Sequence, residues 1–248
     1  KGKIKLLDMV RSSNRAKDVA GIDINMGCPK HFSLSGGMGA ALLSNPSKAR
    51  QIIEAVRNAV DVPVTCKIRI HENVEDTISF CKLMVESGVT SIAVHGRTSK
   101  QRPQHPNQVA AIKCVSTCLS VPVIAKYVGL IRTSVQTISH FKIFKKFCFC
   151  ISGDSGNINA YDDILAFKEK SSCTSVMIAR AAQSNVSVFR KEGKLPLDDV
   201  IKAYLKYAIH YDNCFPNTKY CIQSMLGTLQ DTPRGRKFLE TQNLEQIW

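Results

Sequence analysis

Short runs of β-branched and apolar residues alternate with longer stretches of helical periodicity along most of this sequence. Each strand candidate is followed by turn residues, and the candidates lie at residues 20–25, 62–70, 90–95, 121–125 and 174–179. Helical stretches separate them at residues 45–60, 74–87 and 108–118. Strands that are apolar on both faces and alternate with helices form parallel sheets built from βα units. The sequence therefore predicts an α/β fold.

Two α/β architectures fit this alternation, a doubly wound sheet and a (β/α)8 barrel. The doubly wound sheet lacks its main signature, because no G-x-G-x-x-G motif follows a strand candidate. Polar residues instead end successive strand candidates, which is where a barrel carries its active site. These residues are Asn25 and Cys28, Lys67 and Arg69, His95 and Arg97, and Arg180. We therefore predict a (β/α)8 TIM barrel.

The alternation stops near residue 190. Residues 197–211 and 217–229 have helical periodicity, and no further β-branched run follows them. We therefore expect a barrel domain at residues 1–190 and a small all-helical domain at residues 191–248. The second domain carries lysines and tyrosines that suit RNA binding, although ordinary helix surfaces carry them too: Tyr204, Lys206, Tyr207, Lys219 and Tyr220.

The chain is basic. Its 248 residues include 34 Lys and Arg against 20 Asp and Glu, which gives a formal net charge of +14. This charge favours a polyanionic partner, with nucleic acid ahead of an anionic membrane, but a solvated basic face is the common alternative. No apolar run reaches the roughly 20 residues that a membrane-spanning helix needs, so we expect no membrane partner.

Ten cysteines are scattered through the chain. They form no CxxC pair and no Cys/His cluster with zinc spacing, so the sequence predicts no metal site. Residues 1–11 are charged throughout and do not resemble a signal peptide. Scattered cysteines without a secretory signal are usually buried thiols in a reducing compartment. We therefore predict a cytoplasmic protein, expect a monomer, and expect most of the cysteines to be buried and inert.

Cys28 differs from the other cysteines because it follows a strand candidate and precedes a glycine-rich loop at residues 35–39. A thiol in this place is exposed at the mouth of a barrel, and nearby Lys30 could tune it. A structural cysteine in a tight turn is the alternative. The presence of Lys67, His95 and Arg97 at the ends of the following strands favours a functional Cys28.

Five motifs occur along the chain: NMGCPK at residues 25–30, CKIR at 66–69, VHGR at 94–97, RPQHP at 102–106 and VMIARAA at 176–182. Together they resemble the tRNA-dihydrouridine synthases. The RPQHP motif and the NTKYC stretch at residues 217–221 resemble the eukaryotic branch that acts on position 20 of tRNA. Each motif alone is weak, but five in order are specific. The similarity covers about residues 19–125 and 153–229.

The resemblance implies an FMN-dependent oxidoreductase that takes electrons from NADPH and passes hydride to C6 of a uracil in tRNA. An acid must then protonate C5, which a neutral thiol can do, and the resemblance assigns this step to Cys28. The residues that match flavin-contacting positions are Lys67, His95, Ser152, Gly153, Asp154, Ala179 and Arg180. Those that match positions near the uridine or the tRNA backbone are Asn25, Arg97, Arg102, Gln104 and His105. The resemblance also implies that residues 191–248 are a helical tRNA-binding domain.

The sequence departs from the family in two places. Its five strand candidates correspond to the family's fourth to eighth strands, so we expect a barrel that lacks its first strands and a natural protein that is longer at its N-terminus. Residues 126–152 also interrupt the family's Ala-Asn-Gly-Gly phosphate loop. Codons for residues 126–128 and 151–152 can contain intron boundaries whose removal would restore an asparagine. We therefore interpret residues 126–152 as a translated intron, without which the net charge falls from +14 to +9.

The sequence leaves three functions open. The leading hypothesis is reduction of a specific uridine in tRNA to 5,6-dihydrouridine. The absent strands and the interrupted phosphate loop leave room for a catalytically inactive tRNA-binding remnant of the family. A third hypothesis is a different FMN-dependent barrel oxidoreductase that acts on a free pyrimidine, such as a dihydroorotate dehydrogenase. The basic charge, the helical extension and the RPQHP motif argue against this third function.

Overall fold

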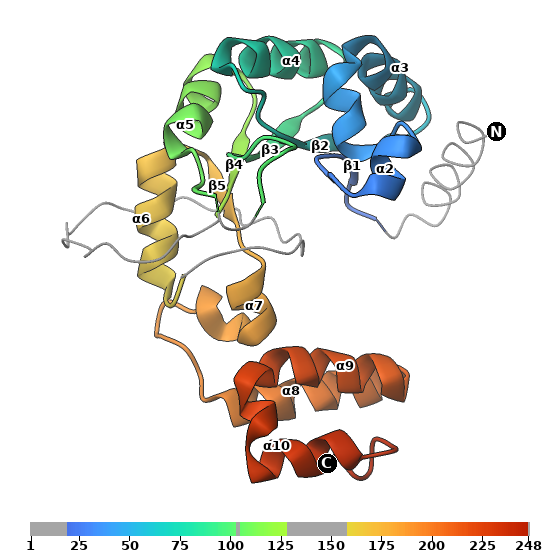
Figure 1. Ribbon diagram of the computed structural model, residues 1–248, viewed down its shortest axis with the longest axis vertical. Helices are drawn as coiled ribbons and strands as arrows, with labels where there is room; N and C mark the ends of the chain where they lie inside the picture. Colours follow the sequence, from blue (N-terminus) through green and yellow to red (C-terminus); the bar gives the residue numbers. More distant parts are fainter. Residues whose placement is uncertain (1–18, 103–104, 128–157, 248) are drawn as a thin grey trace. The chain divides into compact units, whose positions relative to one another are not determined.

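The computed structural model describes residues 19–102, 105–127 and 158–247. These residues form two compact units, which are described separately below (Figure 1). The first unit contains a parallel sheet and comprises the described residues up to 127 together with Ala166–Met177. The second unit comprises residues 158–165 and the described residues from Ile178 onward, and it is mainly helical.

The sheet of the first unit consists of five parallel strands. They are β1 (Ile22–Met26), β2 (Val64–Arg69), β3 (Ser91–His95), β4 (Val123–Lys126) and β5 (Ser175–Met177). Their order in the sheet is their order in the chain, β1-β2-β3-β4-β5. The predicted α/β fold with a parallel sheet is therefore confirmed. A doubly wound sheet reverses its strand order at a switch point, and the described strands show no such reversal.

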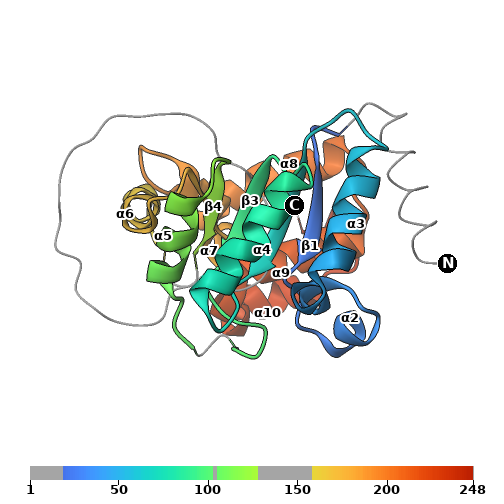
Figure 2. The ribbon, with the colours of Figure 1, turned by 90° about the horizontal axis from the view of Figure 1, so that it is seen from above.

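Helices cover one face of this sheet (Figure 1; Figure 2). The connections between consecutive strands contain α3 (Pro46–Arg57), α4 (Val74–Glu86) and α5 (Val109–Cys118). Two short elements, α2 (His31–Ser35) and the 3-10 helix η1 (Gly39–Ser44), lie between β1 and α3 in the chain. The helix α6 (Tyr161–Ser171) precedes β5.

Capping side chains explain where α3 and α4 begin. The Asn45 side chain accepts a hydrogen bond from the Lys48 amide at 3.1 Å, and Pro46 occupies the first turn of α3. Asn73 caps α4 in the same way, by accepting from the Glu75 amide at 3.2 Å. These bonds satisfy amide groups that have no partner within the helix.

The two faces of the sheet differ in chemistry. On β2, the apolar residues Val64, Cys66 and Ile68 are fully buried. The residues that alternate with them are polar and half-buried: Thr65, Lys67 and Arg69. The helices contribute buried apolar residues of their own: Ala49, Ile53 and Val56 on α3 and Phe80 and Met84 on α4. The apolar core therefore lies between the helices and one face of the sheet, and polar side chains occupy the other face.

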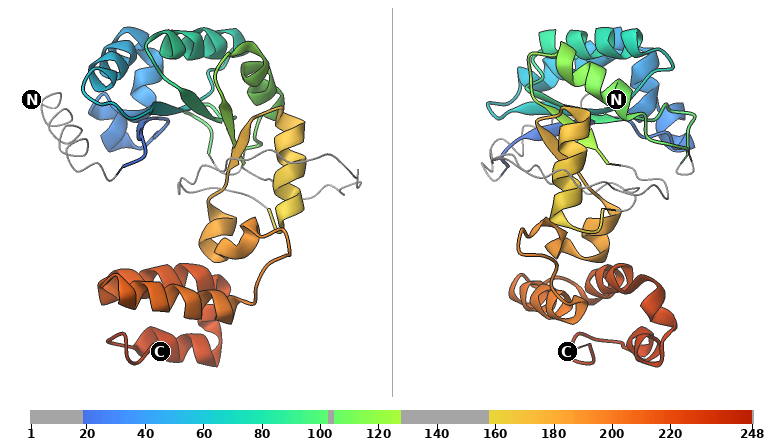
Figure 3. Two further views of the ribbon diagram at one scale, coloured as in Figure 1. Left: turned by 180° about the vertical axis from the view of Figure 1, so that it is seen from behind. Right: turned by 90° about the vertical axis from the view of Figure 1, so that its left-hand side faces the viewer.

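The described residues of the second unit from Ile178 onward form six helical elements. They are α7 (Arg180–Ser184), the 3-10 helix η2 (Val186–Phe189), α8 (Leu197–His210), α9 (Phe215–Leu226), the 3-10 helix η3 (Gly227–Asp231) and α10 (Pro233–Glu240). Helices α8 and α9 lie side by side (Figure 3, orange to red). The helix predicted at residues 217–229 ends earlier, at Leu226, because Gly227 has a φ of +53° and terminates it. Among the described helices, none has the length and apolar character that crossing a bilayer requires.

Candidate active site

The carboxyl ends of the parallel strands bring polar side chains to one edge of the sheet. In the strand register, Asn25 pairs with Lys67. Two residues beyond Lys67, Arg69 pairs with His95, and His95 pairs with Lys126. Paired residues on neighbouring strands, and residues two apart on one strand, point to the same face of a sheet. The structure therefore brings Lys67 and His95, both predicted as flavin contacts, to one face and one edge.

Cys28 lies in the turn that follows β1 and is half-buried. The Asn25 side-chain oxygen accepts hydrogen bonds from the amides of Gly27 at 3.0 Å and Cys28 at 3.1 Å. The Cys28 carbonyl in turn accepts from the Ala40 amide at 2.9 Å. Asn25, which the resemblance assigned to substrate binding, therefore fixes the turn that carries Cys28.

Gly39 packs against Cys28, and two features of this position require glycine. Its φ of +55° lies in the left-handed region that other residues rarely adopt. A Cβ atom at residue 39 would lie 2.9 Å from the Cys28 Cβ and 2.7 Å from the Cys28 carbonyl oxygen. The glycine-rich loop thus lets η1 approach the Cys28 turn closely.

Arg69 connects the Cys28 turn to the loop after β3. Its Nε donates to the Gly27 carbonyl at 2.9 Å, and its Nη1 donates to the carbonyls of Thr98 at 2.9 Å and Gln101 at 3.2 Å. The sequence pattern placed Arg69 at a strand end but gave it no role. Its partners lie 42, 29 and 32 residues away along the chain, so no local sequence signal reveals the bridge.

Two arginines hold the RPQHP loop. Arg97 is only 1% exposed, and its Nε donates to the His105 carbonyl at 2.7 Å. The Arg102 amide donates to His105 Nδ1 at 3.1 Å, and its guanidinium donates to carbonyls of the preceding turn. These contacts support the loop, and the substrate-binding roles predicted for Arg97, Arg102 and His105 stay predictions. Gln104 lies outside the described residues.

His95 is buried at the centre of the polar row, with an exposure of 1%. Burial lowers the pKa of its imidazole far below the ordinary value, and nearby cations lower it further: Lys126, Arg69, Lys67 and Arg97. His95 is therefore neutral at physiological pH. Its Nε2 atom is buried and has no hydrogen-bond partner among the described residues. A buried ring nitrogen among cations is suited to a ligand that is anionic or forms hydrogen bonds.

Lys126 is a residue of this edge that the sequence pattern assigned to the inserted segment. It is the last residue of β4 and is 3% exposed, whereas the predicted strand ended at Ala125. Its carbonyl accepts from Asn107 Nδ2 at 3.1 Å, and the Tyr127 amide donates to the Met177 carbonyl at 3.0 Å. One feature of the sequence could have identified Lys126 as a site residue: like His95, it directly follows the apolar residues of a strand. Residues 128–152 of the predicted insertion lie outside the described residues.

The other predicted flavin contacts lie outside the described residues of the first unit. Ser152, Gly153 and Asp154 lie outside the described residues. Ala179 and Arg180 belong to the second unit, where Ala179 is buried and its carbonyl accepts from the Gln183 amide at 2.8 Å. Arg180 is exposed and begins α7. Their roles toward a flavin therefore stay predictions.

Three of the eight described cysteines are buried, so the expectation that most cysteines are buried is wrong for the described residues. Burial raises the pKa of the Cys81 thiol to about 12 and raises the pKa values of Cys66 and Cys173. Three others occupy solvent-facing positions on α5 and before α9, and they are exposed: Cys114, Cys118 and Cys214. In the described ranges no group of three His, Cys, Asp or Glu side chains could hold a metal ion.

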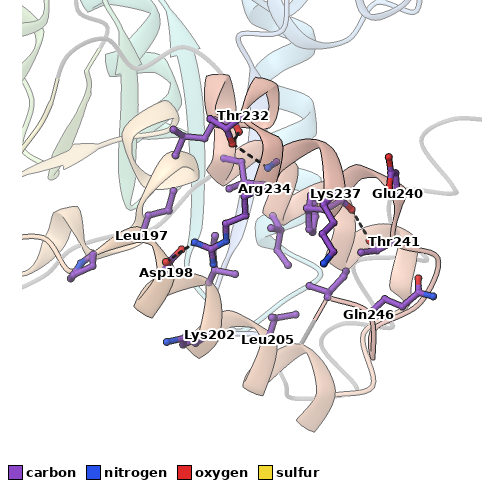
Figure 4. Close-up of a pocket in the computed structure, with 18 of the residues that line it drawn as sticks. Leu197, Asp198, Lys202, Leu205, Thr232, Arg234, Lys237, Glu240, Thr241 and Gln246 are labelled. Atoms are coloured by element: carbon purple, nitrogen blue, oxygen red, sulfur yellow. Dashed lines mark hydrogen bonds and ion pairs between the residues drawn. The ribbon is translucent and has the colours of Figure 1, made fainter.

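The helical unit contains a groove with a volume of about 1210 Å³. Helices α8, α9 and α10 line it with apolar residues that include Leu205, Ile222 and Phe238. Figure 4 shows Arg234 of α10 pointing toward Asp198 of α8, and their charged groups lie 2.8 Å apart. This hydrogen-bonded ion pair lowers the pKa of Asp198.

The fold and the site together define an α/β protein with a thiol, a neutral histidine and several cations at its strand ends. The sequence profile described as Dihydrouridine synthase (Dus) matches residues 5–141, which is more than half of the chain. This chain therefore belongs to the dihydrouridine synthase family, and the predicted relationship is confirmed.

Curated relatives extend the similarity over most of the chain. The tRNA-dihydrouridine(20) synthase [NAD(P)+] of Schizosaccharomyces pombe is 38% identical over 224 residues, which cover 88% of this chain and 41% of the relative. The Saccharomyces cerevisiae protein of the same name is 28% identical over 222 residues, covering 84% and 51%. A human tRNA-dihydrouridine(20a/20b) synthase [NAD(P)+]-like protein is 41% identical over 126 residues, covering 50% and 39%. The chain thus spans about two-fifths to one half of the length of these relatives.

Solved structures give weaker matches. A dihydrodipicolinate synthase from Agrobacterium tumefaciens has a TM-score of 0.46 at 10% identity, over 95% of this chain and 73% of that structure. The enzyme from Acinetobacter baumannii has a TM-score of 0.46 at 11% identity, over 94% and 72%.

Proposed function

We propose that this chain reduces a specific uridine in tRNA to 5,6-dihydrouridine, with FMN as its flavin and NADPH as its source of electrons. Family membership supports the reaction class, and the names of the two yeast relatives support tRNA as the substrate. One observation carries the proposal: Cys28, Lys67 and His95 follow or lie in three adjacent parallel strands at one edge of the sheet.

We assign the five strands to a (β/α)8 TIM barrel. Their order in the sheet equals their order in the chain, and the connecting helices cover one face. Both features are typical of consecutive right-handed βα units in a barrel. The polar strand ends then lie at the face where barrels carry their active sites. Helices α8 to α10 would form the all-helical domain predicted at residues 191–248.

The residues at the strand ends fit a flavin mononucleotide. Its phosphate is anionic, and Lys67, Arg69 and Arg97 concentrate positive charge around His95. The buried Nε2 atom of His95 offers a hydrogen-bonding group that no described residue uses. Lys67 and His95 would therefore hold the flavin, in a site that favours negative charge. When bound, FMN would supply the hydride that C6 of the uracil receives.

Cys28 would donate the proton that C5 of the uracil needs. A general acid must reach its target, and Cys28 is half-buried in a turn at the strand ends. The neighbouring strand offers Cys66 instead, but that thiol is fully buried on the opposite, apolar face. Hydrogen bonds from the turn to Asn25 fix the backbone that carries Cys28. The chain therefore presents one suitable thiol among the described residues of this edge.

The substrate also sets a requirement for binding. A uracil in folded tRNA becomes accessible only after it leaves its stack, so a basic surface must hold the surrounding phosphates. The net charge, which is +14 for the whole chain and +9 without residues 126–152, supports such a surface.

The interpretation of residues 126–152 as a translated intron belongs to this proposal. It predicts that the major mature transcript joins the codon of Ala125 to an asparagine codon and then to the codon of Gly153. Sequencing cDNA across this region tests it. A major transcript that encodes all 27 residues would contradict the interpretation and leave Lys126 as a natural residue of β4.

Product formation on RNA tests the proposed function most directly. The purified chain, loaded with FMN, is incubated with NADPH and an unmodified tRNA transcript, and dihydrouridine is measured by mass spectrometry of the digested RNA. The expected result is dihydrouridine at one position. Cys28→Ala should keep its bound flavin, measured by absorbance, and lose product formation. Cys118→Ser, at an exposed cysteine of α5, is the matched control and should behave like the wild type.

The alternative functions give different outcomes in the same experiment. A chain that binds tRNA, but binds no flavin and forms no dihydrouridine, would be the inactive remnant. Reduction of free uracil or orotate, with none on tRNA, would indicate the oxidoreductase that acts on a free pyrimidine. Full activity of Cys28→Ala would show that another group protonates C5.

A further inference from the structure

Asn107 connects the ends of two neighbouring strands. It directly follows the RPQHP motif and lies in the loop that leads from β3 to α5. Its side-chain Nδ2 donates a hydrogen bond to the Lys126 carbonyl at 3.1 Å, and Lys126 is the last residue of β4. Strands β3 and β4 pair side by side in the sheet (Figure 1). The loop that follows one strand therefore holds the carboxyl end of the next strand.

This one contact orients the Asn107 amide group. The Oδ1 atom of Asn107 is buried and has no hydrogen-bond partner among the described residues. An amide side chain has a donor end and an acceptor end, and its hydrogen bonds decide which way each end points. Because only the donor end has a partner in the described part of the chain, donation to the main chain of residue 126 fixes the side chain.

Gly96 provides the space that Asn107 occupies. A Cβ atom at residue 96 would lie 2.5 Å from Asn107 Oδ1 and 2.9 Å from the Gln108 carbonyl oxygen, so a larger residue would displace this segment. The Gly96 carbonyl also accepts a hydrogen bond from the Gln108 amide at 2.7 Å. The segment that carries Asn107 is therefore held against the residue that directly follows His95.

The main chain at residue 126 lies at a sensitive place for a flavin. Residue 126 pairs with His95 in the strand register, and the buried Nε2 atom of His95 has no partner among the described residues. Barrels frequently bind a phosphate with the loops that follow their seventh and eighth strands. The resemblance makes β4 the seventh strand, so the loop that begins after β4 occupies that place. A shift of residue 126 would therefore move both the neighbour of His95 and the start of this loop.

We propose that Asn107 is a positioning residue for the flavin site. Its amide holds the main chain of residue 126 beside His95, so that the loop after β4 begins where the flavin phosphate binds. Asn107 acts through this main chain and does not itself contact the flavin. The proposal rests on the proposed function and deepens it, because it specifies a residue that fixes the geometry of the cofactor site.

The role of Asn107 does not depend on which side chain occupies position 126. The hydrogen bond ends on a main-chain carbonyl, which every residue has. If residues 126–152 are a translated intron, the asparagine that then follows Ala125 offers the same carbonyl. The proposal therefore applies to the chain with these residues and to the chain without them.

Two substitutions distinguish a donor role from a packing role. Asn107→Leu keeps nearly the same volume and removes the donor, whereas Asn107→Ala removes both the volume and the donor. If Asn107 only fills space, the leucine variant should bind FMN like the wild type and the alanine variant should not. If donation to residue 126 matters, both variants should bind FMN about fivefold more weakly, which is the size of effect expected for one hydrogen bond.

Titration of FMN into the whole chain, stripped of flavin, tests the proposal. Quenching of flavin fluorescence gives the dissociation constant for FMN, at a temperature where every variant is folded by circular dichroism. With FMN at saturating concentration, the Asn107 variants should regain the wild-type kcat and the wild-type KM for tRNA. Loss of affinity for FMN alone is the result expected of a residue that positions the cofactor site.

Asn45 provides the matched control. Its side chain also makes a hydrogen bond to the main chain, to the Lys48 amide at 3.1 Å, but it caps α3 and does not hold a strand end. Asn45→Ala should lower the temperature of unfolding and keep the wild-type affinity for FMN. Wild-type affinity of both Asn107 variants, or of Asn107→Leu alone, would overturn the proposal. An equal loss in Asn45→Ala would also overturn it, because general destabilisation would then explain the effect. If Asn107→Leu does not fold, comparison of Asn107→Ala with Asn45→Ala decides.

Dihydrouridine formation distinguishes failure of this inference from failure of the proposed function. A chain that forms dihydrouridine, and whose Asn107 variants bind FMN normally, would refute the positioning role alone. A chain whose affinity for FMN depends on Asn107, but which never forms dihydrouridine on tRNA, would refute the proposed function alone. A wild-type chain that binds no FMN would refute both.

Discussion

The Arg69 side chain holds the Gly27 carbonyl at 2.9 Å and so fixes the turn that carries Cys28. The same guanidinium holds the carbonyls of Thr98 and Gln101 after β3. One side chain therefore sets the position of the proposed proton donor relative to the loop that leads to the RPQHP motif. The thiol and the cationic edge are parts of one arrangement that depends on Arg69.

Replacing Arg69 by methionine should destabilise the first unit and reduce activity. The change keeps an apolar stem but removes donors to three carbonyls, so the free energy of unfolding should fall by about 2–4 kcal/mol. Chemical denaturation measures this loss. Arg50→Met is the matched control, because Arg50 forms only an exposed ion pair with Glu54 on α3, and it should cost no more than about 0.5 kcal/mol. Equal stability of the two variants would show that the bridge contributes nothing.

Replacing Gly39 by alanine should lower the free energy of unfolding by more than the strain of a left-handed φ alone. Gly39 and Gly193 both have positive φ values, +55° and +99°, so alanine is strained at either site by roughly 1–2 kcal/mol. Only at residue 39 would the added Cβ meet other atoms, those of Cys28 and Ser33, whereas nothing lies within 4 Å at residue 193. The free energy of unfolding should therefore fall further in Gly39→Ala, by about 1–3 kcal/mol more than in Gly193→Ala. Indistinguishable denaturation curves would refute close packing of η1 against the Cys28 turn.

His95 should make the stability of the chain depend on pH in the acidic range. Burial and then the neighbouring cations lower the pKa of the folded-state imidazole, whereas the unfolded chain has an ordinary pKa of about 6.5. Below pH 6.5 the unfolded state therefore binds a proton that the folded state excludes. The free energy of unfolding should be fully maintained above this pH and should fall below it, by up to about 1.4 kcal/mol per pH unit.

Denaturation series between pH 7.5 and pH 5 measure this slope. His95→Gln should reduce the slope of the unfolding free energy against pH by up to about 1.4 kcal/mol per pH unit, which corresponds to one proton. Burial also lowers the pKa of His71, which is less buried, so His71→Gln should reduce the slope by less. Because His95→Gln removes a buried group, NMR of the wild-type imidazole provides a second measurement. A His95 resonance that titrates near pH 6.5 would contradict the buried, neutral histidine.

The order and type of the elements were predictable from the sequence because each depends on local periodicity. The five strands and the helices α3, α4 and α5 lie within a few residues of their predicted positions, whereas α2, η1 and α6 were not predicted. The error at β4 has a simple cause. Lys126 is a cation after an apolar run, so the pattern indicated the start of a loop, whereas its backbone extends the strand and its side chain is buried.

The internal supports of the site were not predictable, because they depend on pairs of residues distant in sequence. Motif positions alone gave Arg97 a place near the substrate, and the structure adds that this buried side chain donates to the His105 carbonyl. The row of Arg69, His95 and Lys126 exists only through the register of three strands. Sequence motifs thus identified which positions matter, and only the fold distinguishes residues that support loops from residues that face the edge.

Lys219 gives a test of this distinction in the helical unit. Its Nζ donates to the carbonyls of Leu239 at 2.6 Å and Thr241 at 2.7 Å, which closes the carboxyl end of α10. Lys219→Met should therefore lower the free energy that protects α10 from opening by about 1–3 kcal/mol, measured by amide hydrogen exchange in α10. Lys237→Met, at an exposed lysine in the last turn of the same helix, should change it by no more than about 0.5 kcal/mol. At a temperature where both variants are folded, Lys219→Met should bind an unmodified tRNA transcript, measured by fluorescence anisotropy, like the wild type. A weaker affinity together with unchanged exchange would mean that Lys219 contacts RNA and that α10 is held by other groups.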